Sequence, residues 1–228
     1  MKQCINATKH FGIVCLLCGL FVGSIEAFSI EDLQDNIKIS LSGKTMQGKF
    51  TQEKQLKGFN NTIKSVGTFS LVGENPQTNE EKTLFWEIHS PIKSTLKITP
   101  KGVFQKELTP QNQPAQNQAT QNQILQNQSD NIPSNQTQWI AINNNQEMLL
   151  EILSIDFKAL QKYFTFSFTH SGEVWLLILK PKNALIAKVF DSIHLQGAIK
   201  YPSLLQKVIL YESNGDITTN IFSNIKIQ

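Results

Sequence analysis

The chain has 228 residues, of which 40% are hydrophobic and 17% are charged, and its formal net charge is +3. It contains no arginine, and its lysines are dispersed along the sequence rather than clustered. Nucleic-acid binding proteins gather arginine and lysine on one face, so this composition argues against a nucleic-acid partner. A chain of this length can bury a sizeable core within one domain.

Residues 1–27 have the pattern of a secretory signal peptide. Two lysines precede the apolar run Phe11–Gly23, and the segment ends on the small residue Ala27. The apolar run is too short to span a bilayer, so we expect export with cleavage near Ala27; a retained N-terminal anchor is the alternative. All three cysteines lie in this leader, so residues 28–228 must fold without disulfides or thiolate metal sites.

An amphipathic helix is predicted over residues 29–43. Ser29 can cap its first turn, Asp32 follows three residues later, and Gly43 can end it. The apolar stripe on this helix is narrow, which indicates that one face lies on another layer of the protein. The stripe consists of Ile30, Leu33, Ile37 and Leu41.

Beyond Gly43, apolar and polar residues alternate, which is the pattern of half-buried antiparallel strands. Residues 145–164 interrupt the strands with one unusually apolar helical stretch, and more strands follow, including 184–195. The turn sequence SNGD at 213–216 predicts a tight hairpin. The pattern predicts a mainly β fold with some α: an incomplete antiparallel β-barrel of about ten strands, covered by two or three helices.

Residues 110–138 form a low-complexity tract rich in Gln and Asn. The triplet QNQ recurs there every five residues, beginning at position 111. Such a segment buries too little apolar surface to offset the entropy lost on ordering, so we expect a mobile loop. The strand pattern resumes at 138–142, which places the loop at the tip of a hairpin within the single domain 28–228. An inert insertion, a partner-binding arm and an aggregation-prone tract all fit this composition.

The sequence does not contain a recognisable catalytic motif. It has no G-x-S-x-G, H-E-x-x-H or Walker-type sequence. His89, His170 and His194 are isolated, without partners at the spacing that a metal site needs. We therefore expect no enzyme activity, no cofactor and no metal. An enzyme would need two or three residues of one set to converge in one cleft: His89, His170, His194, Glu87 and Asp191.

Apolar surface is what the sequence offers instead of catalytic groups. Leu84, Trp86 and Ile88 share one strand face, and Leu96 and Ile98 share another. An open barrel with an apolar inner face and an apolar helix over it could enclose a lipid chain, which gains about 0.8 kcal/mol per buried CH₂. The same side chains could equally fill an ordinary core, and the pattern alone leaves both readings open.

Five motifs follow one another along the chain. They are GKFTQEKQLKG (48–58), GTF (67–69), LFWEIHSP (84–91), ITPKGVFQ (98–105) and VILYESNGDITTNIFSNI (208–225). In this order they resemble the LolA outer-membrane lipoprotein carrier family. The resemblance covers nearly all of residues 28–228 except 110–138. It implies a periplasmic protein whose incomplete antiparallel β-barrel is capped by helices.

This resemblance implies a carrier rather than an enzyme. Members take acylated lipoproteins from an inner-membrane ABC-type release complex and pass them to an outer-membrane receptor. The acyl chains would lie in an apolar cavity beneath a helical lid, and we expect the carrier to act as a monomer. The implied cavity wall consists of Phe69, Leu71, Trp86, Leu96, Ile98 and Phe104. The implied lid consists of Met148, Leu149, Leu150, Leu153 and Phe157.

One departure from the family bears on how such a lid is held. Members commonly carry an arginine in the turn before the tryptophan strand, whereas this turn, residues 72–82, is longer and offers only Lys82. A lysine is a point charge without the planar fork of arginine, so its part in gating is an open question. Two other functions fit the same residues: a shuttle for a glycolipid or other free lipid, and a non-carrier interaction or sensor domain with a filled core.

Overall fold

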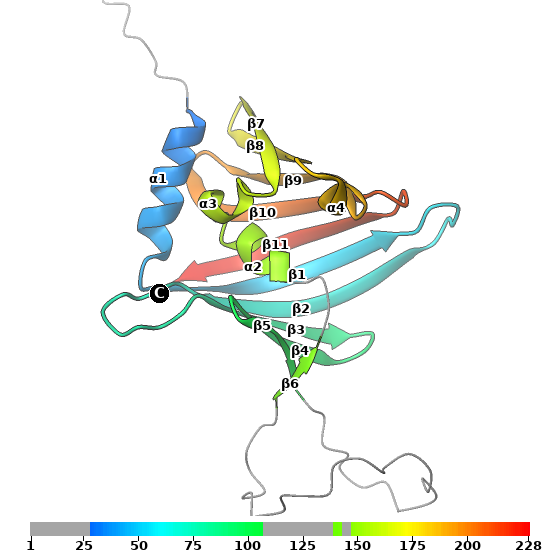
Figure 1. The fold of residues 1–228 in the computed structure, drawn as a ribbon, viewed down its shortest axis with the longest axis horizontal. Helices are drawn as coiled ribbons and strands as arrows, with labels where there is room; N and C mark the ends of the chain where they lie inside the picture. Colours follow the sequence, from blue (N-terminus) through cyan, green and yellow to red (C-terminus); the bar gives the residue numbers. More distant parts are fainter. Residues whose placement is uncertain (1–27, 107–138, 143–146) are drawn as a thin grey trace, which may run out of the picture.

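The computed structural model describes residues 28–106, 139–142 and 147–228. The expected signal peptide (1–27) and the Gln/Asn-rich tract (110–138) lie outside these residues. Eleven strands and four helices make up the described part (Figure 1). None of the described helices is both long enough and apolar enough to cross a membrane.

The strands form one antiparallel sheet in the order β6-β5-β4-β3-β2-β1-β11-β10-β9-β8-β7. The first half of the chain contains α1 (Ile30–Leu41), β1 (Thr45–Gln55), β2 (Thr62–Val72), β3 (Thr83–Ser90), β4 (Ser94–Thr99), β5 (Gly102–Lys106) and β6 (Trp139–Ile142). The second half contains α2 (Glu147–Leu153), α3 (Phe157–Leu160), β7 (Phe164–Ser171), β8 (Val174–Pro181), α4 (Ala184–Ala187), β9 (Phe190–Ala198), β10 (Tyr201–Glu212) and β11 (Ile217–Ile227).

The order of the strands explains why the barrel stays open. The chain begins at the centre with β1 and proceeds by neighbouring pairings to β6 at one edge. The segment with α2 and α3 leads to the other edge, where β7 starts a second series that returns to the centre. There β11 pairs with β1, from Met46↔Ile227 to Gln55↔Ile217. The edge strands β6 and β7 do not pair with each other, so the expected incomplete antiparallel barrel with helices is confirmed (Figure 1). We call this open sheet the half-barrel.

The helix α1 begins and ends as the sequence predicts. Ser29 and Asp32 form a capping box: the Ser29 N–H donates to Asp32 Oδ2 at 2.8 Å, and the Asp32 N–H donates to Ser29 Oγ at 3.2 Å. Leu33 and Ile37 are buried, and the helix contacts β10. At Gly43 φ is +63°, a left-handed conformation that glycine adopts without strain.

The apolar stretch predicted as one helix over 145–164 is broken into two short helices. At Ile155 φ is +44°, so the backbone leaves the right-handed helical region there. Asp156 then starts α3, because its Oδ1 accepts a hydrogen bond from the Ala159 N–H at 3.0 Å. Both pieces turn apolar side chains inward, and Leu150 and Leu160 are at most 1% exposed.

A fourth helix replaces part of a predicted strand. The alternation predicts one strand over 184–195, but Ala184–Ala187 form α4. The Asn183 side chain accepts hydrogen bonds from the N–H groups of Leu185 and Ile186, at 3.1 and 3.0 Å, and so caps a helical turn. The strand β9 therefore starts only at Phe190.

Candidate functional site

The face of the half-barrel that α2 contacts, which we call the inner face, is lined by apolar side chains in register. One cross-strand row contains Leu71, Leu84, Ile98 and Val103, and the next contains Phe69, Trp86 and Leu96. The other half of the sheet adds Trp175, Leu177, Leu179, Ile193, Leu195, Leu205 and Val208. All of these side chains are at most 5% exposed. The apolar lining therefore extends across both halves of the sheet.

Five of the six predicted wall residues lie on the inner face, and Phe104 does not. The register pairs Val103 with Ile98 and Phe104 with Lys97, so Val103 faces inward and Phe104 lies on the outer face. The turn between β4 and β5 explains this difference. The turn between Thr99 and Gly102 has two residues, and residues that are opposite each other in the register share a face. Even-numbered residues of β4 are therefore opposite odd-numbered residues of β5. The expected inward position of Phe104 is therefore wrong.

Trp86 lies in an aromatic cluster on this wall. Its ring stacks on Phe50, with centroids 3.7 Å apart and planes 20° from parallel. Phe222 approaches Trp86 edge-on at 6.3 Å and Phe69 edge-on at 5.3 Å. Trp86 is only 3% exposed, so it contributes apolar area and not a reactive or solvent-facing ring.

The two G-x-F motifs make room for this cluster. In the β1–β2 register Gly48 is opposite Phe69, and Gly67 is opposite Phe50. A Cβ at Gly67 would lie 2.6 Å from the Phe50 ring, and a Cβ at Gly48 would lie 2.9 Å from the Phe69 ring. Each phenylalanine ring therefore lies across the glycine of the neighbouring strand, and a larger residue would displace it.

The helices α2 and α3, which we call the lid, cover the inner face. All five predicted lid residues belong to them or to their ends. Leu150, Leu153 and Phe157 are at most 8% exposed, and Met148 and Leu149 are half-buried against the same core. Three further lid side chains are buried beside them: Ile152, Ile155 and Leu160. The lid thus presents a continuous apolar surface to the sheet.

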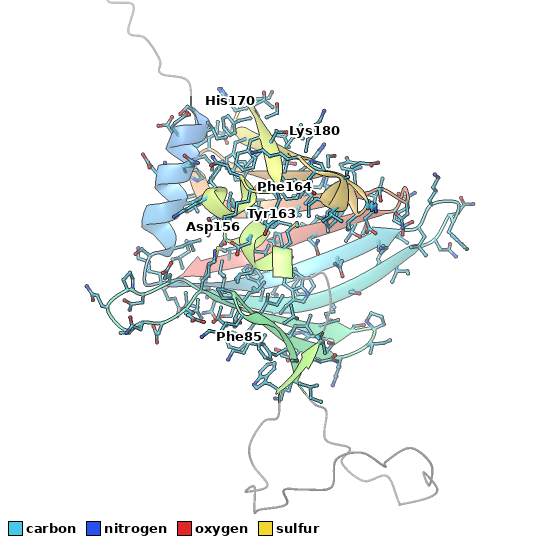
Figure 2. The ribbon with its side chains drawn as sticks, in the orientation of Figure 1. Phe85, Asp156, Tyr163, Phe164, His170 and Lys180 are labelled. Atoms are coloured by element: carbon cyan, nitrogen blue, oxygen red, sulfur yellow. The ribbon has the colours of Figure 1, made fainter. Side chains whose placement is uncertain are left out.

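One lysine ties the lid to the sheet. Lys82, the residue before β3, places Nζ 2.7 Å from Asp156 Oδ2 and 2.9 Å from Glu151 Oε2. The same Nζ donates a hydrogen bond to Ser154 Oγ at 3.2 Å. The Lys82 side chain is 16% exposed, so water screens these contacts only in part. We call these four residues the clasp; Figure 2 shows Asp156 on the side of the lid nearest α1.

The clasp also sets the protonation of Asp156. Partial burial alone would raise the pKa of Asp156, but the hydrogen bonds from Lys82 and from the Ala159 N–H outweigh it and hold that pKa below its ordinary value. The carboxylate is therefore ionised at neutral pH, where its pair with Lys82 is complete. Protonation of Asp156 at acid pH removes the charge that Lys82 pairs with, so this ion pair is lost there.

A cleft of about 580 Å³ opens beside the clasp. Its walls come from α1, from the β2–β3 connection and from the junction between α2 and α3. Its apolar lining includes Ile37, Phe157 and the inner-face residue Leu71, whereas Lys82 and Lys158 make its surroundings polar. The volume falls within the range of about 300–1,000 Å³ that is usual for small-ligand pockets. The cleft therefore extends from exposed polar side chains to the edge of the inner face at Leu71.

The inner face becomes polar where β1 ends. Lys54 Nζ lies 2.9 Å from Glu212 and 3.5 Å from Asp216, and Thr218 Oγ1 donates to Glu212 at 2.8 Å. Burial lowers the pKa of Lys54, but its pairing with Glu212 outweighs this and raises that pKa. The hydrogen bond from the Lys57 N–H is the main cause that lowers the pKa of Asp216, and contacts with Asn214 and Lys54 lower it further. The apolar lining thus ends in a group of paired charges.

Two buried polar atoms of the described interior have no hydrogen-bond partner. They are Trp175 Nε1, a donor, and Asn220 Oδ1, an acceptor. Both side chains are at most 2% exposed, and both belong to the inner face, where Asn220 is opposite Val208. An unpaired buried group costs about 1–3 kcal/mol. One donor and one acceptor of the described interior therefore remain unpaired.

The histidines considered as catalytic groups belong to different strands. His89, on β3, places Nε2 3.3 Å from Thr68 Oγ1 and 3.7 Å from Glu87. His194 is on β9 and His170 is on β7, and six strands separate β3 from β7 in the sheet. Within the described ranges, no group of three or more His, Cys, Asp or Glu side chains is placed to hold a metal ion.

No protein-family model and no curated protein matches this chain. Among solved structures, the MucA/MucB complex of Pseudomonas aeruginosa matches at 9% identity and a TM-score of 0.44, over 86% of this chain and 56% of that chain. A LolA superfamily protein from Nitrosomonas europaea matches at 7% and 0.39, over 88% and 94%. A putative outer membrane lipoprotein-sorting protein domain from Vibrio parahaemolyticus matches at 9% and 0.33, over 86% and 91%.

The chain spans a little over half the length of the MucB chains that it matches. Likenesses this distant say nothing about cargo or partners. The open antiparallel sheet and its helical cover are, however, the architecture that the motif resemblance implies. The fold is therefore an incomplete antiparallel barrel under a helical cover.

The sequence patterns did not predict the inward position of Val103 or the part of Glu151 and Asp156 in the clasp. Strand alternation does not fix the length of the turn at 100–101, so it could not show that Val103 and not Phe104 faces inward. No local signal links Glu151 and Asp156 to Lys82, because they are brought together only when the lid packs on the sheet.

Proposed function

We propose that this protein is a periplasmic carrier that binds the acyl chains of lipoproteins between the inner face and the lid, and moves them from the inner to the outer membrane. The observation that carries this proposal is an apolar inner face closed by two short helices, which the clasp ties to the sheet on the side of β3. Since α2 and α3 take no part in strand pairing, the lid can move without breaking the half-barrel.

The free energy lost when the lid opens can be compared with the free energy gained when an acyl chain is buried in its place. Opening exposes six buried side chains, at about 1.5–3 kcal/mol for each: Leu150, Ile152, Leu153, Ile155, Phe157 and Leu160. It also breaks the clasp, whose charged hydrogen bonds contribute about 1–3 kcal/mol. An acyl chain of about 16 carbons gains up to ~13 kcal/mol on full burial, at ~0.8 kcal/mol per CH₂. This gain is of the same order as the two costs together, so a bound acyl chain can hold the lid open only where its own contacts replace those that the lid loses.

The carrier catalyses no reaction in this proposal, and its partners act at the two membranes. An inner-membrane ABC-type complex releases the acylated lipoprotein to it, and an outer-membrane receptor accepts the cargo. Residues 1–27, as a signal peptide, deliver the chain to the periplasm. The separation of His89, His170 and His194 on different strands supports a binding role.

A second function is favoured by how completely the lid fills the interior. Leu150 and Leu160 are at most 1% exposed, as are Leu71 and Leu84 on the facing sheet. A domain that keeps this closed interior acts as an interaction or sensor module rather than as a carrier. A free lipid or glycolipid is the alternative cargo if the interior opens.

Neighbouring residues on β5 provide a matched test of these functions. Val103 faces inward and is 2% exposed, whereas Phe104 is on the outer face. A photo-crosslinking amino acid placed at 103 should capture cargo in living cells, and the same group at 104 should not. An adduct with the mass of an acylated protein supports the lipoprotein carrier, and a lipid-sized adduct supports the free-lipid shuttle.

Native mass spectrometry of the purified protein, followed by organic extraction, gives an independent reading of the same question. Co-purified acylated protein agrees with the carrier. An apo mass, no uptake of a fluorescent acyl probe and equal crosslinking at 103 and 104 would together overturn the carrier and leave the filled domain.

A further inference from the structure

The three most exposed large apolar side chains of the described residues are all at one end of the sheet. Ile92 is 79% exposed, Leu185 is 74% exposed and Phe59 is 66% exposed. They lie on the β3–β4 connection, on α4 between β8 and β9, and on the β1–β2 connection. In an antiparallel sheet of this order these connections share one end, which Figure 1 shows on the side away from α1. We call these three side chains the apolar tips.

Hydrogen bonds hold two of the tip-bearing connections in place. The Lys57 N–H donates to Asp216 Oδ1 at 2.9 Å, which joins the β1–β2 connection to the β10–β11 turn. The Ser213 N–H of that turn donates to the Val189 carbonyl at 3.0 Å, which joins it to the segment after α4. Phe59 and Leu185 are therefore presented from a connected surface and not from independent loops.

Positive charge accompanies the apolar tips. The described connections between neighbouring strands at this end, 56–61, 91–93, 182–189 and 213–216, contain four lysines: Lys57, Lys93, Lys182 and Lys188. The same connections contain one carboxylate, that of Asp216, and Lys54 lies 3.5 Å from it. The connections at the other end of the sheet carry four lysines as well, but four carboxylates balance them: Glu74, Glu80, Glu81 and Glu173.

We propose that this end of the half-barrel docks on an anionic membrane surface, with the apolar tips among the headgroups and the lysines beside the lipid phosphates. Apolar side chains set among basic residues bind the interface by burying apolar area and by attracting anionic lipid. Each lysine near such a surface strengthens binding about fivefold. Lysine stems also extend along the interface while their charges stay in water. Four lysines against one paired carboxylate favour lipid phosphates over a neutral surface. This inference concerns docking and does not depend on the cargo.

The test is flotation of the exported, purified protein with vesicles. Vesicles of phosphatidylethanolamine and phosphatidylglycerol supply the anionic surface, and phosphatidylcholine vesicles supply the neutral one. The variant Phe59→Ser/Ile92→Ser/Leu185→Ser removes the tips, which are too exposed to support the fold. We expect the wild-type protein to float with the anionic vesicles and this variant to lose about tenfold or more of that binding.

A matched control removes exposed apolar side chains from the other end. Val174 and Tyr201 are 37% and 55% exposed and follow the β7–β8 and β9–β10 turns, so Val174→Ser/Tyr201→Ser should bind vesicles as the wild type does. Uptake of a fluorescent acyl probe should be the same in all three proteins, which separates docking from cargo binding. The inference is overturned if the tip variant binds like the wild type, if the wild type floats with neither vesicle, or if it binds both vesicles equally.

Discussion

Replacing Lys82 by methionine tests whether the clasp holds the lid. The substitution keeps a side chain of similar length but leaves the carboxylates of Glu151 and Asp156 without their common cation. Hydrogen bonds to charged groups are worth about 1.5–3 kcal/mol when sheltered, and Asp156, at 34% side-chain exposure, is only partly sheltered. We therefore expect the closed lid to lose about 1.5–2 kcal/mol, which is about a ten- to thirtyfold change in the opening equilibrium.

Hydrogen exchange measured by mass spectrometry follows this opening directly. Peptides that cover 147–163 should exchange faster in Lys82→Met by that factor, while peptides from β10 and β11 keep their wild-type rates. Lys101→Met is the matched control. Lys101 also makes an ion pair, with Glu81 at 2.7 Å, but its side chain is 75% exposed, so its loss should leave the lid unchanged.

The reasoning fails if Lys82→Met and Lys101→Met give the same lid exchange as the wild type. It also fails if Lys82→Met speeds exchange throughout the sheet, because the lysine would then support the whole fold rather than the lid. A double-mutant cycle with Asp156→Asn isolates the pair itself, and a coupling near zero would remove Asp156 from the clasp.

Three further predictions test individual contacts. Because the pKa of Asp156 is lowered in the folded protein, its ionised carboxylate stabilises the fold fully above the ordinary carboxyl pKa of about 3.9. This stabilisation is lost as the pH falls through the lower pKa of the folded state. In urea unfolding at a series of pH values, the free energies of unfolding of the wild type and Asp156→Asn should become equal in that range. Gly67→Ala should cost about 1–3 kcal/mol in urea unfolding, because its Cβ would collide with the Glu87 carbonyl oxygen and lie 2.6 Å from the Phe50 ring; an unchanged midpoint would contradict the packing. Asn220→Leu should raise the thermal midpoint of the ligand-free protein by the equivalent of about 1–2 kcal/mol, since it removes an unpaired buried acceptor; a lower midpoint would show that this oxygen is paired.

Local patterns were sufficient to predict most of the architecture. The capping box at Ser29 and the glycine at 43 fix both ends of α1, and each depends only on residues within a few positions. The alternation in 83–90 and 94–99 predicts which side chains share a face, and the register places Leu84, Trp86 and Leu96 together as expected. Such signals survive folding because the core reinforces the preference that each segment already has.

The misplaced or missed residues depend on contacts that local patterns do not contain. Phe104 and Val103 exchange faces because the turn between β4 and β5 has two residues, and the strand alternation cannot reveal the length of a turn. The helix α4 forms because Asn183 caps it, against an alternation that suits a strand. The clasp joins Lys82 to residues about 70 positions away, a distance that only the packed lid closes.

Ile155 shows why the lid was predicted as one helix and is observed as two. Its left-handed backbone costs about 1–2 kcal/mol for a residue with a Cβ, and glycine is the usual occupant of such a helix end. In the closed lid Ile155 is 3% exposed, and burying its side chain gains about 1.5–3 kcal/mol, which offsets that cost. Once the lid lifts, the burial is lost and the strain is not, so the backbone at 155 should return to the right-handed region and join α2 to α3. Binding of an acyl probe should then increase the helical circular dichroism signal, and Ile155→Gly, which tolerates the left-handed turn in either state, should show less of this increase. No increase in the wild type on binding would mean that the lid moves as two separate helices.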